Sequence, residues 1–345
     1  MMKAIVIHAA HDLHVENWPE EELEPGKVLL RVAVGGICGS DLHYYNHGGF
    51  GAVRLREPMV LGHEVSAYVE KLGDGVNGLQ IGQLVAVSPS RPCGTCRFCW
   101  EGLHNQCLNM RFYGSAMPFP HIQGAFRERL VADAVQCIPA DGLSPAEAAM
   151  AEPLAVTLHA THRTGKAFGK RVLVTGCGPI GTLAILAARR AGAAEIVATD
   201  LSDFALSKAL QVGADKVINT GKDNEALSAY EAEKGTFDIV YECSGSAVAL
   251  HGAIKAMRPR GVIVQLGLGG DMSLPMMAIT SKELEIRGSF RFHEEFALAV
   301  GLMQKGLIDV KPLITHEVKF NDAESAFKLA SDRSRAMKVQ MAFQA

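Results

Sequence analysis

The second half of the chain alternates short β-rich runs with helical stretches, and this pattern restricts the fold more than any other feature. The runs are rich in Val and Ile and lie at residues 172–175, 196–198, 216–218, 239–241 and 262–266. Helical stretches separate them, for example residues 179–191 and 202–212. Such regular alternation indicates βαβ units. The sequence therefore predicts an α/β fold with a doubly wound parallel sheet and helices on both faces.

A glycine-rich turn directly follows the first of these runs and opens a helix rich in Ala and Leu. Its residues are Gly176, Gly178, Pro179, Ile180 and Gly181. A strand, a tight glycine turn and a helix N-terminus, in that order, are what a dinucleotide pyrophosphate requires. We expect a Rossmann-type cofactor site here.

Asp200 ends the next run, about twenty residues after the glycine turn, where a carboxylate accepts hydrogen bonds from the adenosine ribose hydroxyls. Leu201 follows it, and no arginine lies close behind to receive a 2′-phosphate. The sequence therefore favours NAD over NADP. The alternative is that Asp200 only caps the helix that begins near Ser202, and the two roles are compatible.

The first part of the chain has a different pattern, in which short apolar runs such as residues 28–34 and 84–87 are broken by glycine-rich turns. This pattern predicts irregular β structure. We expect a β-rich domain over residues 1–148 and a dinucleotide-binding domain over residues 149–284. Residues 285–345 are expected to return to the first domain and complete it.

Four of the eight cysteines are packed into fifteen residues, at Cys93, Cys96, Cys99 and Cys107. Four thiolates in one loop are enough to close a tetrahedral zinc site with no position left for a substrate, which is typical of structural zinc. Unligated or disulfide-paired cysteines are the alternative. The tight spacing and an expected reducing compartment favour the metal.

A second set of metal-ligand types is spread over two loops. Cys38 lies in the segment GGICGSDLH, and His63 and Glu64 lie in LGHE. A thiolate and an imidazole joined by a carboxylate make three protein ligands and leave a fourth position open, as a catalytic zinc requires. Each of these residues alone would be an ordinary core or turn residue.

In this order, GGICGSDLH, PMVLGHE, the four-cysteine loop and GCGPIG resemble the zinc-containing medium-chain dehydrogenase family over essentially the whole chain. The segment AEPLAV, which contains Glu152, resembles that of the sorbitol dehydrogenase branch, where a glutamate replaces the second cysteine ligand of the catalytic zinc. The segments ICGSDLHYY, MRFYGSAM and RGSFRF are most similar to the bacterial L-idonate 5-dehydrogenases. The resemblance implies a GroES-like catalytic domain and a Rossmann domain, with nicotinamide beside zinc in the cleft between them.

The resemblance also implies roles for single residues. Cys38 and His63 would bind the catalytic zinc, with Glu64 and Glu152 both at the site and the direct ligand among them left open. Ser40 and His43 match the family's proton-relay positions, although both are also ordinary turn residues. The substrate-pocket positions are matched by Tyr44, Phe112 and Arg291.

The activity that the resemblance implies is hydride transfer between the secondary hydroxyl of a sugar acid and NAD. Zinc supplies the Lewis acid and the nicotinamide accepts the hydride. L-idonate, oxidised at C5 to 5-ketogluconate, is the expected substrate, with sorbitol, xylitol and threonine dehydrogenases as alternatives. A catalytically inactive binding homologue is disfavoured, because it would have lost at least one ligand.

Composition and charge exclude several other classes. The hydrophobic fraction of 48% and the charged fraction of 21% are typical of a soluble globular enzyme. A net charge of −3 without a Lys/Arg cluster gives no basis for binding nucleic acid or a membrane surface. The start of the chain has no signal-peptide pattern, so we expect a cytoplasmic protein. The resemblance implies a homodimer or homotetramer.

Overall fold

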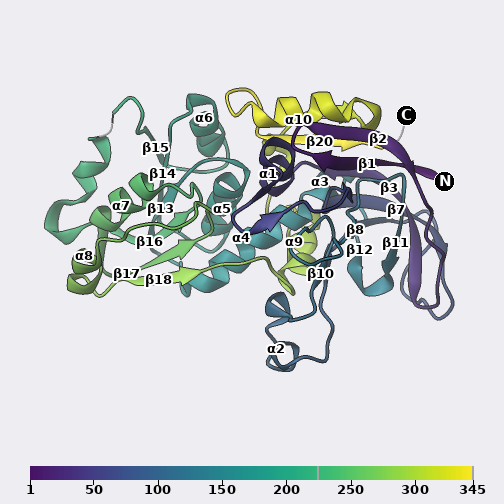
Figure 1. Ribbon diagram of the computed structural model, residues 1–345. Coiled ribbons are helices and arrows are strands. Elements are labelled where there is room, and N and C mark those ends of the chain that lie inside the picture. The colour runs from purple at the N-terminus through teal and green to yellow at the C-terminus, as the bar shows by residue number, and fades with distance from the viewer. Residues whose placement is uncertain (224, 344–345) are drawn as a thin grey trace.

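The computed structural model describes residues 1–223 and 225–343 and contains a β-rich unit and an α/β unit side by side (Figure 1). A six-stranded sheet forms the centre of the α/β unit, with the strand order β15-β14-β13-β16-β17-β18 and every pair parallel. Its strands are β13 (Arg171–Thr175), β14 (Glu195–Asp200), β15 (Lys216–Asn219), β16 (Phe237–Glu242), β17 (Met257–Gln265) and β18 (Glu285–Gly288). The predicted Rossmann fold is confirmed. The order reverses between β13 and β16, and dinucleotides bind at this point of such sheets.

Helices cover both faces of the parallel sheet, as the alternation predicted. They are α4 (Ala151–Thr164), α5 (Pro179–Arg190), α6 (Asp203–Gln211), α7 (Ala247–Ala256) and α8 (Met276–Ser281). Successive side chains of a strand point to opposite faces. Val172 and Val174 of β13 therefore join one buried cluster with α5, while Leu173 joins another with α7.

The β-rich unit contains a seven-stranded sheet and a three-stranded sheet. The strands of the larger sheet are β3 (Lys27–Gly36), β7 (Glu64–Leu72), β8 (Leu84–Val87), β11 (Arg129–Asp133), β12 (Cys137–Pro139), β19 (Ile314–Lys319) and β20 (Lys338–Ala342). The smaller sheet contains β1 (Met2–Ala9), β2 (Asp12–Trp18) and β6 (Met59–Val60). Because β20 pairs antiparallel with β3, the end of the chain lies in the same sheet as its first third.

The expected boundary at residues 284/285 needs a correction. β18 pairs with β17 in the parallel sheet, so the chain leaves the α/β unit only after Gly288. The next elements are α9 (Glu295–Gln304) and α10 (Ala323–Ser331). α9 packs against α4, and both belong to a buried cluster that extends into the β-rich unit. The two units therefore share a continuous apolar core.

Short elements complete the β-rich unit. They are α1 (Gly39–His47), β4 (Gly49–Phe50), β5 (Val53–Arg54), β9 (Ser90–Arg91), α2 (Arg97–Trp100), β10 (Arg111–Phe112) and α3 (Pro145–Ala149). The lobe around α2 projects from the body of the molecule (Figure 1). Among the described residues, no helix is both long and apolar enough to cross a membrane.

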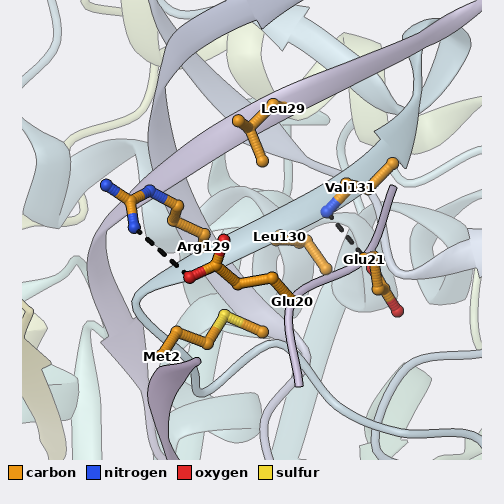
Figure 2. A pocket seen from close by; sticks show the side chains of 7 residues that line it. All are labelled: Met2, Glu20, Glu21, Leu29, Arg129, Leu130 and Val131. Atoms are coloured by element: carbon orange, nitrogen blue, oxygen red, sulfur yellow. Dashed lines mark hydrogen bonds and ion pairs between the residues drawn. The ribbon is translucent and has the colours of Figure 1, made fainter. Parts of the chain in front are cut away.

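One small cavity lies beside β3 and β11 in the β-rich unit (Figure 2). Its volume is about 40 Å³, and Arg129 and Glu20 form an ion pair at its wall. Such a space holds about one or two water molecules. None of the residues predicted for the site lines it, so it is not the substrate pocket.

Candidate active site and metal centres

The four cysteines of the projecting lobe meet at one point. Their sulfur atoms all lie within 4.8 Å of one another, and none of the eight cysteines, all in the described part of the chain, forms a disulfide. The backbone N–H groups of Cys93 and Asn109 donate to the Cys107 sulfur at 3.2 and 3.3 Å. N–H donors around sulfur favour the thiolate form that zinc binds. The lobe therefore fits a closed zinc site.

Pairing of β3 with β7 brings the residues of the second cluster together. Glu64 is the first residue of β7 and stands opposite Gly36, the last residue of β3, while Cys38 caps α1 just beyond it. The ligand atoms of Cys38, His63 and Glu64 lie within 4.8 Å of one another. Nδ1 of His63 is buried without a hydrogen-bond partner among the described residues. Burial, followed by the charge of Glu64, raises the pKa of the Cys38 thiol to about 12, so a thiolate here requires a cation. A catalytic metal fits this donor set.

Lys338 is a buried residue beside this cluster that the sequence analysis did not identify. Its Nζ donates to both carboxylate oxygens of Glu64, at 2.8 and 2.7 Å, and to the carbonyl oxygen of Ile37 at 3.1 Å. The two side chains are only 2% and 1% exposed. Burial lowers the pKa of Lys338, but the charges of Glu64 and Cys38 outweigh it, so the net direction is upward. No local sequence signal marks a lysine on a core strand as the partner of a residue far away in the chain.

Glu152 lies in the first turn of α4 and is buried. Burial is the main cause that raises its pKa well above the usual range, and the charges of His63, Glu64 and Cys38 also act on it. Glu152 therefore faces the same cluster, although its oxygens are not part of the 4.8 Å group. Glu64, in contrast, belongs to the 4.8 Å group, and its carboxylate also forms an ion pair with Lys338.

Asp41 joins the two ligand loops. It is fully buried, and its oxygens accept hydrogen bonds from the backbone N–H groups of Cys38 at 3.0 Å and Gly62 at 3.3 Å. Its Oδ1 lies 3.7 Å from Nδ1 of His63. The two groups make no hydrogen bond at this distance, but they interact through charge: burial raises the pKa of Asp41, and His63 opposes that shift. A buried acid three residues after Cys38 is a signal that the sequence analysis did not use.

The other residues of α1 face the same region. Ser40 and His43 are half-buried, and burial lowers the pKa of His43. The hydroxyl of Tyr44 is buried and accepts a hydrogen bond from the N–H of Ala116 at 3.0 Å. Helix α1 therefore carries the predicted relay and pocket residues on the turns that follow Cys38.

Arg291 brings the pocket residues together. Its guanidinium lies 4.2 Å from the ring centre of Phe112, and that ring is 5.6 Å from the ring of His63. Burial lowers the pKa of Arg291 to about 10, while the charges of Glu152 and Tyr44 oppose this shift. Within the described part of the chain the guanidinium contacts aromatic rings and the sulfur of Met117, and it forms no ion pair. A desolvated cation without an acidic partner is suited to bind an anionic or polyhydroxylated ligand.

The glycine turn has the geometry of a dinucleotide site. Gly176 has φ 83°, and a Cβ on it would meet Ser244 at 2.8 Å. Gly178 caps α5, whose first residues are Pro179 and Ile180. A Cβ on Gly181 would overlap the carbonyl of Gly176, so only glycine allows helix and turn to pack this closely.

Asp200 lies beside this turn. Its two oxygens accept hydrogen bonds from the N–H groups of Cys177 at 2.7 Å and Ser202 at 2.8 Å. The residue that caps α6 is Ser202, which accepts from the N–H of Ala205. Asp200 is thus a carboxylate fixed at the end of β14, next to the glycine turn, rather than the helix cap.

Comparison with known proteins agrees with this geometry. The family model "Alcohol dehydrogenase GroES-like domain" matches residues 24–142, and the model "Zinc-binding dehydrogenase" matches residues 179–305. L-idonate 5-dehydrogenase (NAD(P)(+)) of Escherichia coli K12 is 45% identical over 321 residues, which cover 91% of each chain. The chain belongs to the zinc-binding alcohol dehydrogenase family.

Two further comparisons place the chain within this dehydrogenase family. The crystal structure of the E. coli L-idonate 5-dehydrogenase superposes with a TM-score of 0.95 at 42% identity and covers 99% of this chain and 98% of that one. Sorbitol dehydrogenase of Bos taurus is 36% identical over 342 residues, covering 98% of this chain and 95% of the relative. The resemblance seen in the sequence is confirmed.

Glu242 is a buried acid of the dehydrogenase that the sequence analysis also missed. It ends β16 and accepts hydrogen bonds from Ser244 N–H at 2.9 Å, Gly245 N–H at 3.1 Å and Gln265 Nε2 at 2.5 Å. The hydroxyl of Thr175, at the end of β13, also donates to it at 3.3 Å. Glu242 therefore ties together the ends of three strands at the point where the strand order reverses.

Proposed function

We propose that this dehydrogenase oxidises a secondary hydroxyl of a sugar acid with NAD, and that its substrate is L-idonate, oxidised at C5 to 5-ketogluconate. The half-buried Arg291, which has no acidic partner within the described residues, carries this proposal. A guanidinium binds a carboxylate through two parallel hydrogen bonds. The relative of 45% identity, whose name gives L-idonate as its substrate, supports the same class.

Each of the predicted site residues has a proposed role in this reaction. Cys38 and His63 would hold the catalytic zinc together with Glu64 or Glu152, and the four cysteines of the lobe would hold the structural zinc. When bound, the catalytic zinc lowers the pKa of a hydroxyl that it coordinates. Ser40 and His43 would carry the released proton towards solvent. Tyr44, Phe112 and Arg291 would orient the sugar acid.

We assign the direct ligation to Glu64 and the proton chemistry to Glu152. Glu64 belongs to the 4.8 Å group with Cys38 and His63, and Lys338 holds its carboxylate in place. Glu152 is buried outside that group and forms no ion pair within the described residues. Glu152→Gln should depress turnover strongly while zinc content and NADH binding stay normal. A variant that loses zinc would reverse the assignment, and near-normal turnover would make Glu152 structural.

A neutral polyol is the second candidate, because sorbitol dehydrogenases are 36–37% identical relatives. Arg291 also donates to hydroxyl groups, so the choice between the two depends on the charge of the substrate. The test compares kcat/KM for L-idonate, L-iditol, sorbitol, xylitol and threonine in the wild type and in Arg291→Ala. Preference of the wild type for a neutral polyol would refute the sugar-acid proposal. An equal loss on both classes in the variant would remove only the role of Arg291.

For the cofactor, Asp200 supports NAD, because its carboxylate lies beside the glycine turn and repels a 2′-phosphate. The name of the E. coli relative gives both NAD and NADP, and the test compares kcat/KM for the two cofactors with this chain.

For assembly, a homodimer or homotetramer joined through the nucleotide-binding units is supported by β18. This strand ends the parallel sheet, and its Ile286 is 39% exposed. Size-exclusion chromatography with light scattering tests this. We also place the protein in the cytoplasm, which suits a cluster of reduced cysteines; fractionation of cells tests that location.

A further inference from the structure

The segment that carries Arg291 needs support from outside itself. Residues 289–294 connect β18 to α9, and Arg291 has φ 56°, in the left-handed region that residues with a side chain rarely adopt. Such a conformation persists when the surroundings determine it. The contacts on either side of Arg291 therefore show what holds the guanidinium in place.

The cysteine lobe supplies the first of these contacts. Nδ2 of Asn105 donates to the carbonyl oxygen of Phe290 at 2.9 Å. The ring of His104 stacks on the ring of His293, with the centres 4.2 Å apart and the planes at 26°. His104 and Asn105 lie in a short 3₁₀ turn between Cys99 and Cys107. The lobe thus contacts the residue before Arg291 and the residue two positions after it.

The base of the lobe supplies a wall for the guanidinium. Phe112 lies on β10, which pairs with β9, and these two strands carry the chain out of and into the lobe. Arg291 lies over the Phe112 ring at 4.2 Å and over the Phe290 ring at 4.8 Å. The lobe therefore both holds the backbone around Arg291 and forms a face of its site.

The opposite side of the segment is fixed to α4. Glu295 accepts hydrogen bonds from the rings of His159 at 2.9 Å and His162 at 3.0 Å, and from the backbone N–H of His293 at 3.1 Å. Helix α4 begins next to Glu152, so this anchor is rigidly linked to the reacting region. With this side fixed, the position of Arg291 depends on the lobe.

We propose that His104 and Asn105 are positioning residues, through which the four-cysteine lobe sets the preference of the enzyme for an anionic substrate. They act through the carbonyl oxygen of Phe290 and the ring of His293, not through direct contact with substrate or cofactor. The inference rests on the proposed function, because it assigns Arg291 to the negative group of the substrate. It adds that a lobe with the composition of a structural metal site also determines specificity.

The experiment uses the zinc-loaded full-length enzyme and the His104→Ala/Asn105→Ala double variant. Loss of a hydrogen bond and a ring stack should raise KM for L-idonate roughly ten- to fiftyfold. The kcat for L-idonate and the kcat/KM for the neutral L-iditol should change less than about threefold, because the metal cluster and cofactor site are untouched. Zinc content and NADH affinity, measured by elemental analysis and fluorescence titration, should equal those of the wild type.

Four further single variants make the test more specific. The single variant His104→Phe retains a ring for stacking on His293, so its KM for L-idonate should equal that of the wild type. The single variant His104→Ala lacks this ring, so its KM for L-idonate should rise. Trp100→Ala is the matched control, because Trp100 belongs to the same lobe but is 77% exposed and should leave both substrates unaffected. If the double variant loses zinc, Asn105→Ala alone decides the question.

The outcomes separate this inference from the proposed function. Two results would overturn the positioning role and leave the proposed function standing. The first is an equal loss of kcat/KM for L-idonate and for L-iditol in the double variant. The second is an unchanged double variant while Arg291→Ala selectively loses kcat/KM for L-idonate. If the wild type itself prefers L-iditol, the proposed function fails, and the inference fails with it for that separate reason. A selective loss that His104→Phe avoids supports the inference.

Discussion

Replacing Lys338 with methionine is expected to lower the free energy of unfolding by about 3–5 kcal/mol, because the substitution leaves the Glu64 carboxylate buried without its cation. The Lys338 Nζ lies 2.7 Å from Glu64 Oε2. Unit charges at that distance attract by roughly 6 kcal/mol at an effective dielectric constant of about 20. The desolvation of both charged groups offsets part of this attraction in the wild type, so the expected net loss is smaller than the attraction.

The assay is urea-induced unfolding followed by circular dichroism on the metal-stripped protein, with the zinc-loaded protein measured in parallel. If zinc binds Glu64, the bound metal should offset part of the loss. The Glu64→Gln/Lys338→Met double variant removes both charges and should recover at least about half of the stability. Lys328→Met is the control, since Lys328 and Glu324 form an exposed i,i+4 pair and the stability should change far less than in Lys338→Met.

Two results would refute this reasoning. A loss below about 1 kcal/mol in Lys338→Met would mean that water reaches the pair and screens its charges. A double variant as unstable as the sum of the single variants would mean that the charges do not interact, since coupled residues deviate from additivity.

Three further predictions concern metal, cofactor and pH. Elemental analysis should find about two zinc ions per chain, and chelation should remove activity before stability, because a closed thiolate site exchanges more slowly than an open one; one metal per chain would contradict the assignment. Asp200→Ala should weaken NAD binding in a fluorescence titration and reduce discrimination against NADP, whereas a wild type that already prefers NADP would exclude this role. Burial raises the pKa of Glu295, but hydrogen bonds from His159 and the His293 N–H outweigh it and lower the pKa to about 2. The stabilisation, about 1–2 kcal/mol after allowance for solvent screening, is therefore present above pH of about 4.5 and lost towards pH 2. Glu295→Gln should cost stability at pH 7 and much less near pH 2.5, and an unchanged difference between these pH values would argue against the mechanism.

Some of the site is determined by short stretches of sequence, since those residues act through local geometry. The turn at Gly176 needs glycine at φ 83°, and its strand and helix follow within a few residues. The four cysteines of the lobe are close in the chain, so their clustering follows from spacing alone. The alternation of strands and helices likewise decided the parallel sheet, because each βαβ unit is a local structure.

Tertiary structure decided the features that join distant segments. Lys338 reaches Glu64 only because β20 pairs with β3, a contact between the two ends of the chain that no local pattern encodes. The α/β unit extends to Gly288 because β18 pairs with β17 in the parallel sheet, and the residues of this segment do not by themselves show which unit the strand joins. The sequence indicated Arg291 as a pocket residue but not the lobe residues that contact its segment. Those contacts are a hydrogen bond and a ring stack between elements that are far apart in the chain. Side-chain chemistry along the chain therefore identified the ligands, whereas the charges that balance them and the contacts that position them required the folded chain.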